Sequence, residues 1–277
     1  MWNVRAIDGL GVATFVTPLV GPFEGMAARF GEFGYAFGAR FAVAAGLAAT
    51  ATASNLATFS LLPGLWFAAR GARTAPLKVP LIVAAVVAAI GSVYGAFIGR
   101  MGPEGAAAFN TSGIRSAQSF VVFGTLGLAL LAWAAYRASL AARQSSEGPG
   151  LSHLFLAQPA VTAVIAGLIA GGFSLGRPLA VFREFLLYTS QPNSALYGAA
   201  VVALQSLATM AIPLGLLVCA IQLGRVRTSA TVIAPCRAAF ISAVAMSGGG
   251  AFLIFYWGIQ RVWPSLGRWG FQLGLYQ

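Results

Sequence analysis

Cys219 and Cys236 are the only thiols in the sequence, and a pair of thiols can exchange electrons through a disulfide. They stand on either side of a short turn at residues 224–231, so two helices joined there would hold them at similar depths. Pro235 directly precedes Cys236, and a cysteine at a helix start can have a lowered pKa. A redox pair is one interpretation. The other is that both are small apolar side chains in the core.

Glu24 and Arg177 form a second candidate pair, because each stands near a proline that interrupts an apolar segment. Ionisable side chains at membrane depth usually face a cavity or a partner, so Glu24 could pair with Arg177 or with Arg183. Alternatively, both charges lie at the level of the lipid headgroups and extend toward water. We interpret Arg183 and Glu184 as a loop pair rather than as part of a site.

Few other residues could carry chemistry. His153 is the only histidine, and a structural zinc site needs four nitrogen or sulfur ligands, whereas a bis-histidine haem needs two histidines. We therefore expect no metal site and no cofactor, and we expect His153 to be a solvated side chain near the membrane surface. Without a catalytic constellation, the sequence favours a protein that is not an enzyme.

The composition predicts a polytopic membrane protein. Hydrophobic residues make up 58% of the chain and charged residues 8%, against roughly a quarter charged in soluble domains. The net charge of +11 comes from arginines at the ends of apolar segments, where they can meet anionic headgroups. The bilayer is thus the expected partner, and nucleic acid is excluded because no basic, aromatic-rich surface is present.

We expect an all-α bundle of six or seven transmembrane helices, two of them broken by prolines. A membrane-spanning helix needs about 20 apolar residues. The second candidate is longer than one crossing requires, so it should tilt or bend at Pro63. The dense basic loops that follow residues 67 and 223 favour a cytoplasmic N-terminus, which we expect to be retained. The candidates are residues 10–30, 37–67, 79–98, 117–136, 155–176, 196–223 and 233–259.

The chain divides into two membrane halves, residues 1–143 and 153–277, joined by a flexible polar linker at 144–152. The second half contains residues 171–217, where proline-broken apolar segments flank a charged turn. A proline removes a backbone donor, so such breaks indicate discontinuous helices that line a cavity. This arrangement is typical of transporters.

Two stretches of the sequence resemble the DsbD/CcdA family of membrane domains, which pass reducing equivalents across the inner membrane. The first is Thr17-Pro18-Leu19-Val20-Gly21-Pro22-Phe23, similar to the family's Thr-Pro-Cys-Val-Leu-Pro motif. The second combines Ser174-Leu175-Gly176-Arg177-Pro178 with Leu186-Leu187-Tyr188-Thr189-Ser190-Gln191, the Leu196-Tyr197-Gly198-Ala199 step and the Ile212-Pro213-Leu214 ending. The resemblance implies that Thr17, Pro18, Pro22, Glu24, Arg177 and Pro178 meet at the protein centre.

The family's two reactive cysteines are missing from these motifs. Leu19 occupies the first position, and a leucine cannot replace a thiolate nucleophile. A member poor in cysteine resembles the MauF branch of methylamine-utilisation clusters, which helps to assemble a periplasmic enzyme. The resemblance therefore implies a multi-pass maturation factor of the bacterial inner membrane, with a periplasmic thioredoxin-like or redox-enzyme partner.

Three other functions stay open at the level of sequence. The chain could conduct electrons through Cys219 and Cys236, or transport an ion or small solute at Glu24 and Arg177. It could also be a structural subunit of a larger membrane complex.

Overall fold

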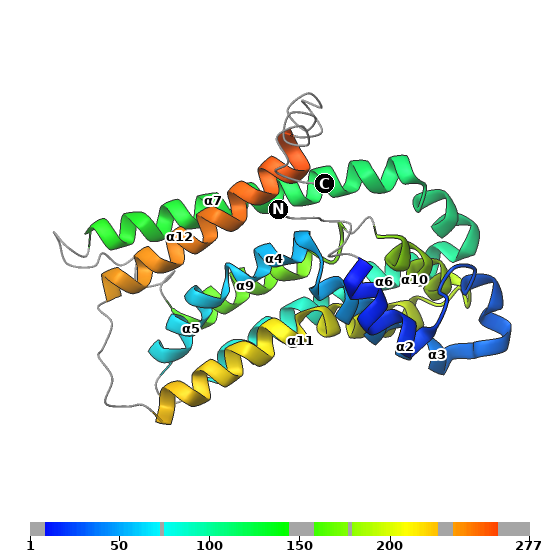
Figure 1. Cartoon of the computed structure of the whole chain (residues 1–277), viewed down its shortest axis with the longest axis horizontal. Coiled ribbons are helices and arrows are strands. Elements are labelled where there is room, and N and C mark those ends of the chain that lie inside the picture. The colour runs from blue at the N-terminus through cyan, green and yellow to red at the C-terminus, as the bar shows by residue number, and fades with distance from the viewer. Residues whose placement is uncertain (1–8, 73–74, 144–157, 177–178, 227–234, 260–277) are drawn as a thin grey trace.

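The computed structural model describes residues 9–72, 75–143, 158–176, 179–226 and 235–259 (Figure 1). Every regular element in these ranges is a helix, which confirms the expected all-α class for the described part of the chain. Four helices are long and apolar enough to cross a membrane, so the chain is a membrane protein with several spans. They are α6 (Lys78–Phe109), α7 (Ser112–Arg143), α11 (Ala195–Val226) and α12 (Pro235–Leu253).

Shorter helices occupy the rest of the described chain. A π-helical turn, η1 (Val12–Val16), leads into α2 (Thr17–Val20), which ends at Gly21 with a φ of 81°. A 3-10 turn, η2 (Ala27–Arg29), then precedes α3. The other elements are α3 (Phe30–Thr50), α4 (Ala53–Phe59), α5 (Leu62–Gly71), α9 (Pro159–Gly172), α10 (Ala180–Ser190) and the terminal π-helical η3 (Ile254–Ile259).

The two halves of the chain repeat one order of elements. In the first half, the broken helix α3–α4–α5 is followed by α6 and α7; in the second, the broken helix α9–α10 is followed by α11 and α12. The most extensive interfaces join equivalent helices, α6 with α11 and α7 with α12. Two further pairs of contacts are reciprocal, since α3 packs on α11 as α9 packs on α6, and α5 packs on α9 as α10 packs on α3.

Equivalent helices run antiparallel, as Figure 1 shows for α7 and α12. Along α6, Gly91, Gly95 and Gly99 approach residues of α11 whose numbers fall from 206 to 194. The halves are therefore related as an inverted repeat, the arrangement on which many membrane transporters are built.

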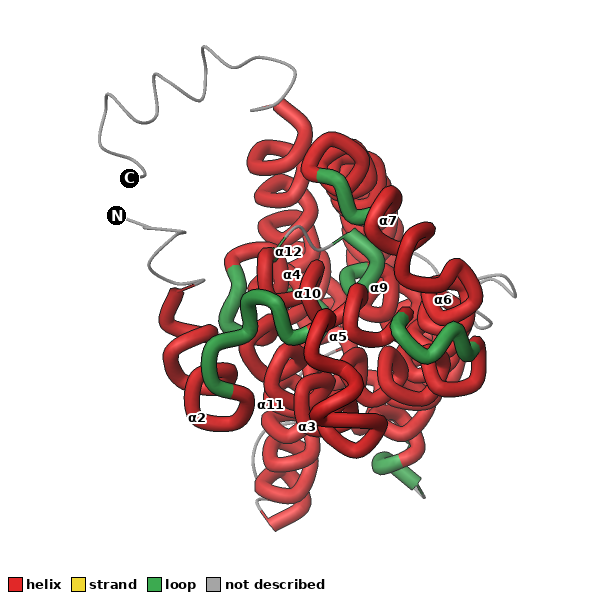
Figure 2. Tube along the Cα trace, turned by 90° about the vertical axis from the view of Figure 1, so that its right-hand side faces the viewer, coloured by secondary structure: helices red, strands yellow, loops and turns green. Residues whose placement is uncertain are grey.

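The helices form three layers. Figures 1 and 2 place α7 and α12 on one side, α6, α11 and α3 on the other, and α4, α5 and α9 between them. One core cluster of buried side chains joins α5, α6, α7, α9 and α12, whereas a second joins α3, α6, α10 and the N-terminal turns. The later part of the first broken helix, α4 and α5, and the first part of the second, α9, thus lie inside the bundle, between the long helices.

The first broken helix changes direction earlier than its sequence suggests. We expected this segment to tilt or to bend at Pro63, but α3 already ends at Thr50, and Thr52 has an extended backbone with a ψ of 150°. A second turn at Ser60 and Leu61 leads into α5. Pro63 stands in the first turn of α5, where a missing backbone donor costs little.

Candidate functional site

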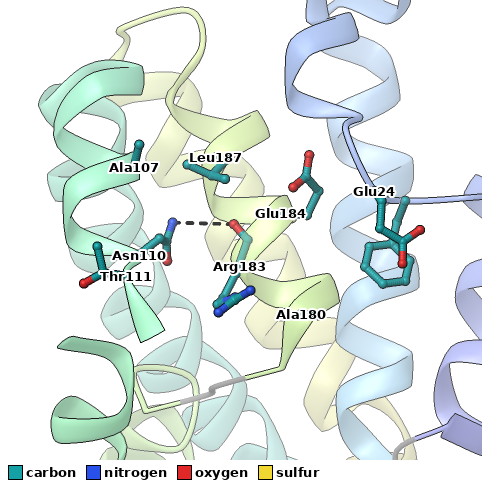
Figure 3. Close-up of a pocket in the computed structure, with 9 residues that line it drawn as sticks. Glu24, Ala107, Asn110, Thr111, Ala180, Arg183, Glu184 and Leu187 are labelled. Carbon is teal, nitrogen blue, oxygen red and sulfur yellow. Dashed lines mark hydrogen bonds between the residues drawn. The ribbon is translucent and has the colours of Figure 1, made fainter. Parts of the chain in front are cut away.

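A pocket of about 550 Å³ opens at the end of the bundle where α6 and α10 meet the loop that follows α2. Three of the four charged residues that we considered as candidates line it, namely Glu24, Arg183 and Glu184. Figure 3 shows Asn110 and Arg183 on one side of it and Glu24 on the other, with Glu184 between them. The lining residues are Phe23, Glu24, Ala107, Asn110, Thr111, Ala180, Arg183, Glu184 and Leu187.

Local backbone features hold these side chains in place. Helix α6 bends at Gly102, whose φ of 68° favours glycine, and its final turns lead to Asn110. The Asn110 Nδ2 donates to the Arg183 carbonyl oxygen at 3.5 Å, which links α6 to α10. The Ala27 N–H donates to Glu184 Oε1 at 2.9 Å, which links η2 to the same helix.

The charged side chains that line the pocket do not pair, and they point in different directions in Figure 3. Within the described ranges the one ion pair is Arg29–Glu32, so neither Glu24 nor Glu184 lies within 4.0 Å of the Arg183 guanidinium. Glu24 is exposed in its loop, whereas Arg183 and Glu184 are half-buried on α10. Our interpretation of Arg183 and Glu184 as a loop pair is therefore wrong. Both are helical and line the pocket.

Asn110 carries an unusual polar atom. The residue is only 7% exposed, yet its Oδ1 is buried and has no hydrogen-bond partner. Buried polar atoms in folded proteins are nearly always hydrogen-bonded, and an orphaned acceptor calls for an explanation. Because Asn110 lines the pocket, a bound donor can supply that partner.

The pocket lies at the end of the bundle rather than at its centre. From Lys78 to Arg100, α6 rises by roughly 33 Å, which already exceeds a hydrocarbon core of about 30 Å. The pocket residues of α6 follow the bend at Gly102. Glu24 and Arg183 line the same pocket, while Arg177 and Pro178 lie outside the described residues. Thr17, Pro18 and Pro22 are exposed rather than central.

A second polar region lies deep in the bundle, where the break after α3 packs on α11. The Thr50 hydroxyl donates to the Thr209 carbonyl oxygen at 2.8 Å. Pro213 lacks the N–H that would otherwise bond this carbonyl, so Thr50 satisfies the acceptor that the proline leaves free. The Gln205 Nε2 donates to the Thr209 hydroxyl at 3.1 Å. Both Gln205 Oε1 and Ser206 Oγ are buried without a partner.

Sequence reasoning missed the buried Arg115. It lies in the first turn of α7 and is 2% exposed. Its Nη1 donates at 2.7 Å both to the Tyr94 hydroxyl and to Gln118 Oε1. The aromatic rings of Phe109 and Phe182 lie within 6 Å of the guanidinium. In the sequence, the position of a single arginine at the start of a long apolar run was the signal that could have indicated this burial.

The cysteines occupy different layers. Cys219 is a free thiol exposed on α11, and the side chain of Cys236, at the start of α12, lies outside the described side chains. Helix α11 packs mainly on α6 and α12 mainly on α7, so the helix hairpin that we expected from residues 224–231 does not form an extensive interface. His153 also lies outside the described residues. Among those described, no cluster of three or more potential metal ligands is present.

Comparisons of the chain with models of known protein families, with curated proteins and with solved structures give no match. We therefore infer the function from the geometry of the structure itself.

Proposed function

We propose that this chain is a multi-pass membrane carrier whose site lies where the break between α3 and α4 packs against α11. The observation that carries the proposal is the position of the Thr50–Thr209 hydrogen bond, close to the midpoint of the span Ala195–Gly224. In carriers built from inverted repeats, substrate sites lie near the bilayer midplane, between discontinuous helices. A small polar solute or a cation could bind Gln205 Oε1 there, which is buried and has no hydrogen-bond partner.

We also propose, from the resemblance to DsbD/CcdA, that the carrier serves the maturation of a periplasmic redox protein in a bacterial inner membrane. It would do so without a cysteine pair of its own. The separate packing of α11, which carries Cys219, and of α12, which begins at Pro235 and Cys236, supports a mechanism that does not use this pair of thiols. A thioredoxin-like protein or the redox enzyme itself would receive what the carrier delivers.

A double substitution, Cys219→Ser with Cys236→Ser, tests the thiol-free mechanism. In a strain that lacks the wild-type chain, the double variant should restore the yield of haem-stained c-type cytochromes and other active periplasmic redox enzymes as fully as the wild type. Loss of that yield with normal amounts of the variant in the membrane would instead identify an electron conductor that uses these thiols.

Labelling from both sides of the membrane tests the carrier mechanism. In the cysteine-free background, Thr52→Cys at the break after α3 should react with a charged, impermeant thiol reagent from either face of proteoliposomes, because a carrier exposes its site alternately. Leu216→Cys, on the exposed side of α11, should react from neither face, because the hydrocarbon excludes the reagent. Reaction of Thr52→Cys from one face only would indicate a static scaffold.

A further inference from the structure

We propose that the pocket between α6, α10 and the loop after α2 binds a small zwitterion that carries a primary ammonium and a phosphate or carboxylate. This inference goes beyond the proposed carrier function and does not depend on it, because the pocket lies at the end of the bundle rather than at the break after α3.

The first argument is the arrangement of charge. Glu24, Arg183 and Glu184 line one pocket, and no carboxylate among them lies within 4.0 Å of the guanidinium. Opposite charges held apart across a cavity are complementary to a ligand with opposite charges at its two ends. The Arg183 guanidinium suits a phosphate or carboxylate, because its planar donors match the oxygens of these groups.

The second argument is the supply of acceptors for an ammonium group. Asn110 Oδ1 is buried and unpartnered, and the Glu184 carboxylate has a single described partner, the Ala27 N–H on Oε1. The Glu24 carboxylate has none among the described residues. A primary ammonium offers three N–H donors, whereas a quaternary ammonium offers none. The pocket should therefore prefer the primary amine.

The third argument is the place and size of the pocket. It lies at the end of the bundle, past the bend at Gly102, and the part of α6 before that bend is long enough to cross a hydrocarbon core of about 30 Å, so we infer that the cavity opens to the headgroup layer. Phosphatidylethanolamine carries the required ammonium and phosphate in its headgroup, and a free amino-acid-like solute carries the same chemistry in water. About 550 Å³ is ample for either, since pockets for small molecules begin near 300 Å³.

The experiment compares O-phosphoethanolamine with phosphocholine as probes. The purified chain in nanodiscs of phosphatidylcholine and phosphatidylglycerol is titrated with each compound by calorimetry. We expect phosphoethanolamine to bind at least about tenfold more tightly than phosphocholine, and Arg183→Gln and Glu184→Gln each to weaken it by about tenfold or more. The matched controls Arg100→Gln and Glu104→Gln, on the exposed face of α6 outside the pocket, should bind as the wild type does.

A second titration identifies the source of the ligand. If the lipid headgroup occupies the pocket, nanodiscs that contain phosphatidylethanolamine will weaken the apparent binding of phosphoethanolamine and raise the melting temperature of the wild type but not of Arg183→Gln. If the ligand is a free solute, phosphoethanolamine will bind equally in both nanodiscs. The proposal is overturned by equal binding of phosphocholine, by folded pocket variants that bind as the wild type does, or by the absence of both phosphoethanolamine binding and lipid-dependent stabilisation.

Discussion

Helix α6 carries two regions that differ in almost every physical respect. Between Gly91 and Gly99 it crosses α11 so closely that the glycine backbones touch, with Gly95 against Gly198. Beyond the bend at Gly102, it ends in an open pocket lined by charged side chains that do not pair. The close crossing is built from backbone packed against backbone, whereas the pocket contributes little packing. Stability and recognition are thus separated along one helix.

Gly95→Val should have the largest effect on this comparison. A Cβ at Gly95 would overlap the Gly198 carbonyl oxygen, and backbone cannot move aside as a flexible side chain can. We expect a loss of about 3 kcal/mol or more in the free energy of unfolding, measured by circular dichroism in a denaturing-detergent titration. Gly215→Ala on α11 is the control, because nothing lies within 4 Å of its added methyl group. Equal stability of both variants would mean that the close crossing does not hold the fold.

Thr50→Val should have an intermediate effect. It removes the hydroxyl that bonds the Thr209 carbonyl, so the variant should lose about 1 kcal/mol in the same assay. In a Pro213→Ala background the new N–H can bond that carbonyl within α11, and the cost of Thr50→Val should fall below about 0.5 kcal/mol. Thr125→Val on the exposed face of α7 is the control. An identical cost in both backgrounds would rule out the compensation between Thr50 and Pro213.

Glu24→Gln should have the smallest effect on stability. Glu24 is exposed and forms no described ion pair, so we expect its free energy of unfolding to stay within about 0.5 kcal/mol of the wild type. The same variant should still bind phosphoethanolamine more weakly than the wild type. A marked loss of stability would place Glu24 in the structural frame and weaken the division between crossing and pocket.

Neither the glycine crossing nor the pocket was predicted from the sequence, although the sequence contains a signal for each of them. Gly91, Gly95 and Gly99 recur at every fourth residue, the spacing that places small side chains on one face of a helix. The spacing does not determine which helix packs against that face. The pocket left a weaker signal, because its residues come from a loop, the end of α6 and α10, which are far apart in the chain.

The sequence by itself determined that this protein is helical and crosses a membrane several times, since the lengths and hydrophobicity of its segments are local properties. It left open whether the second apolar segment tilts or bends at Pro63, and Pro63 marked only the later of the two turns. Only the tertiary structure decided that the halves are antiparallel, that Arg115 is buried and that Glu24 and Arg183 line one pocket. These features depend on which surfaces meet, and the free energy of packing is shared between helices that are distant in sequence.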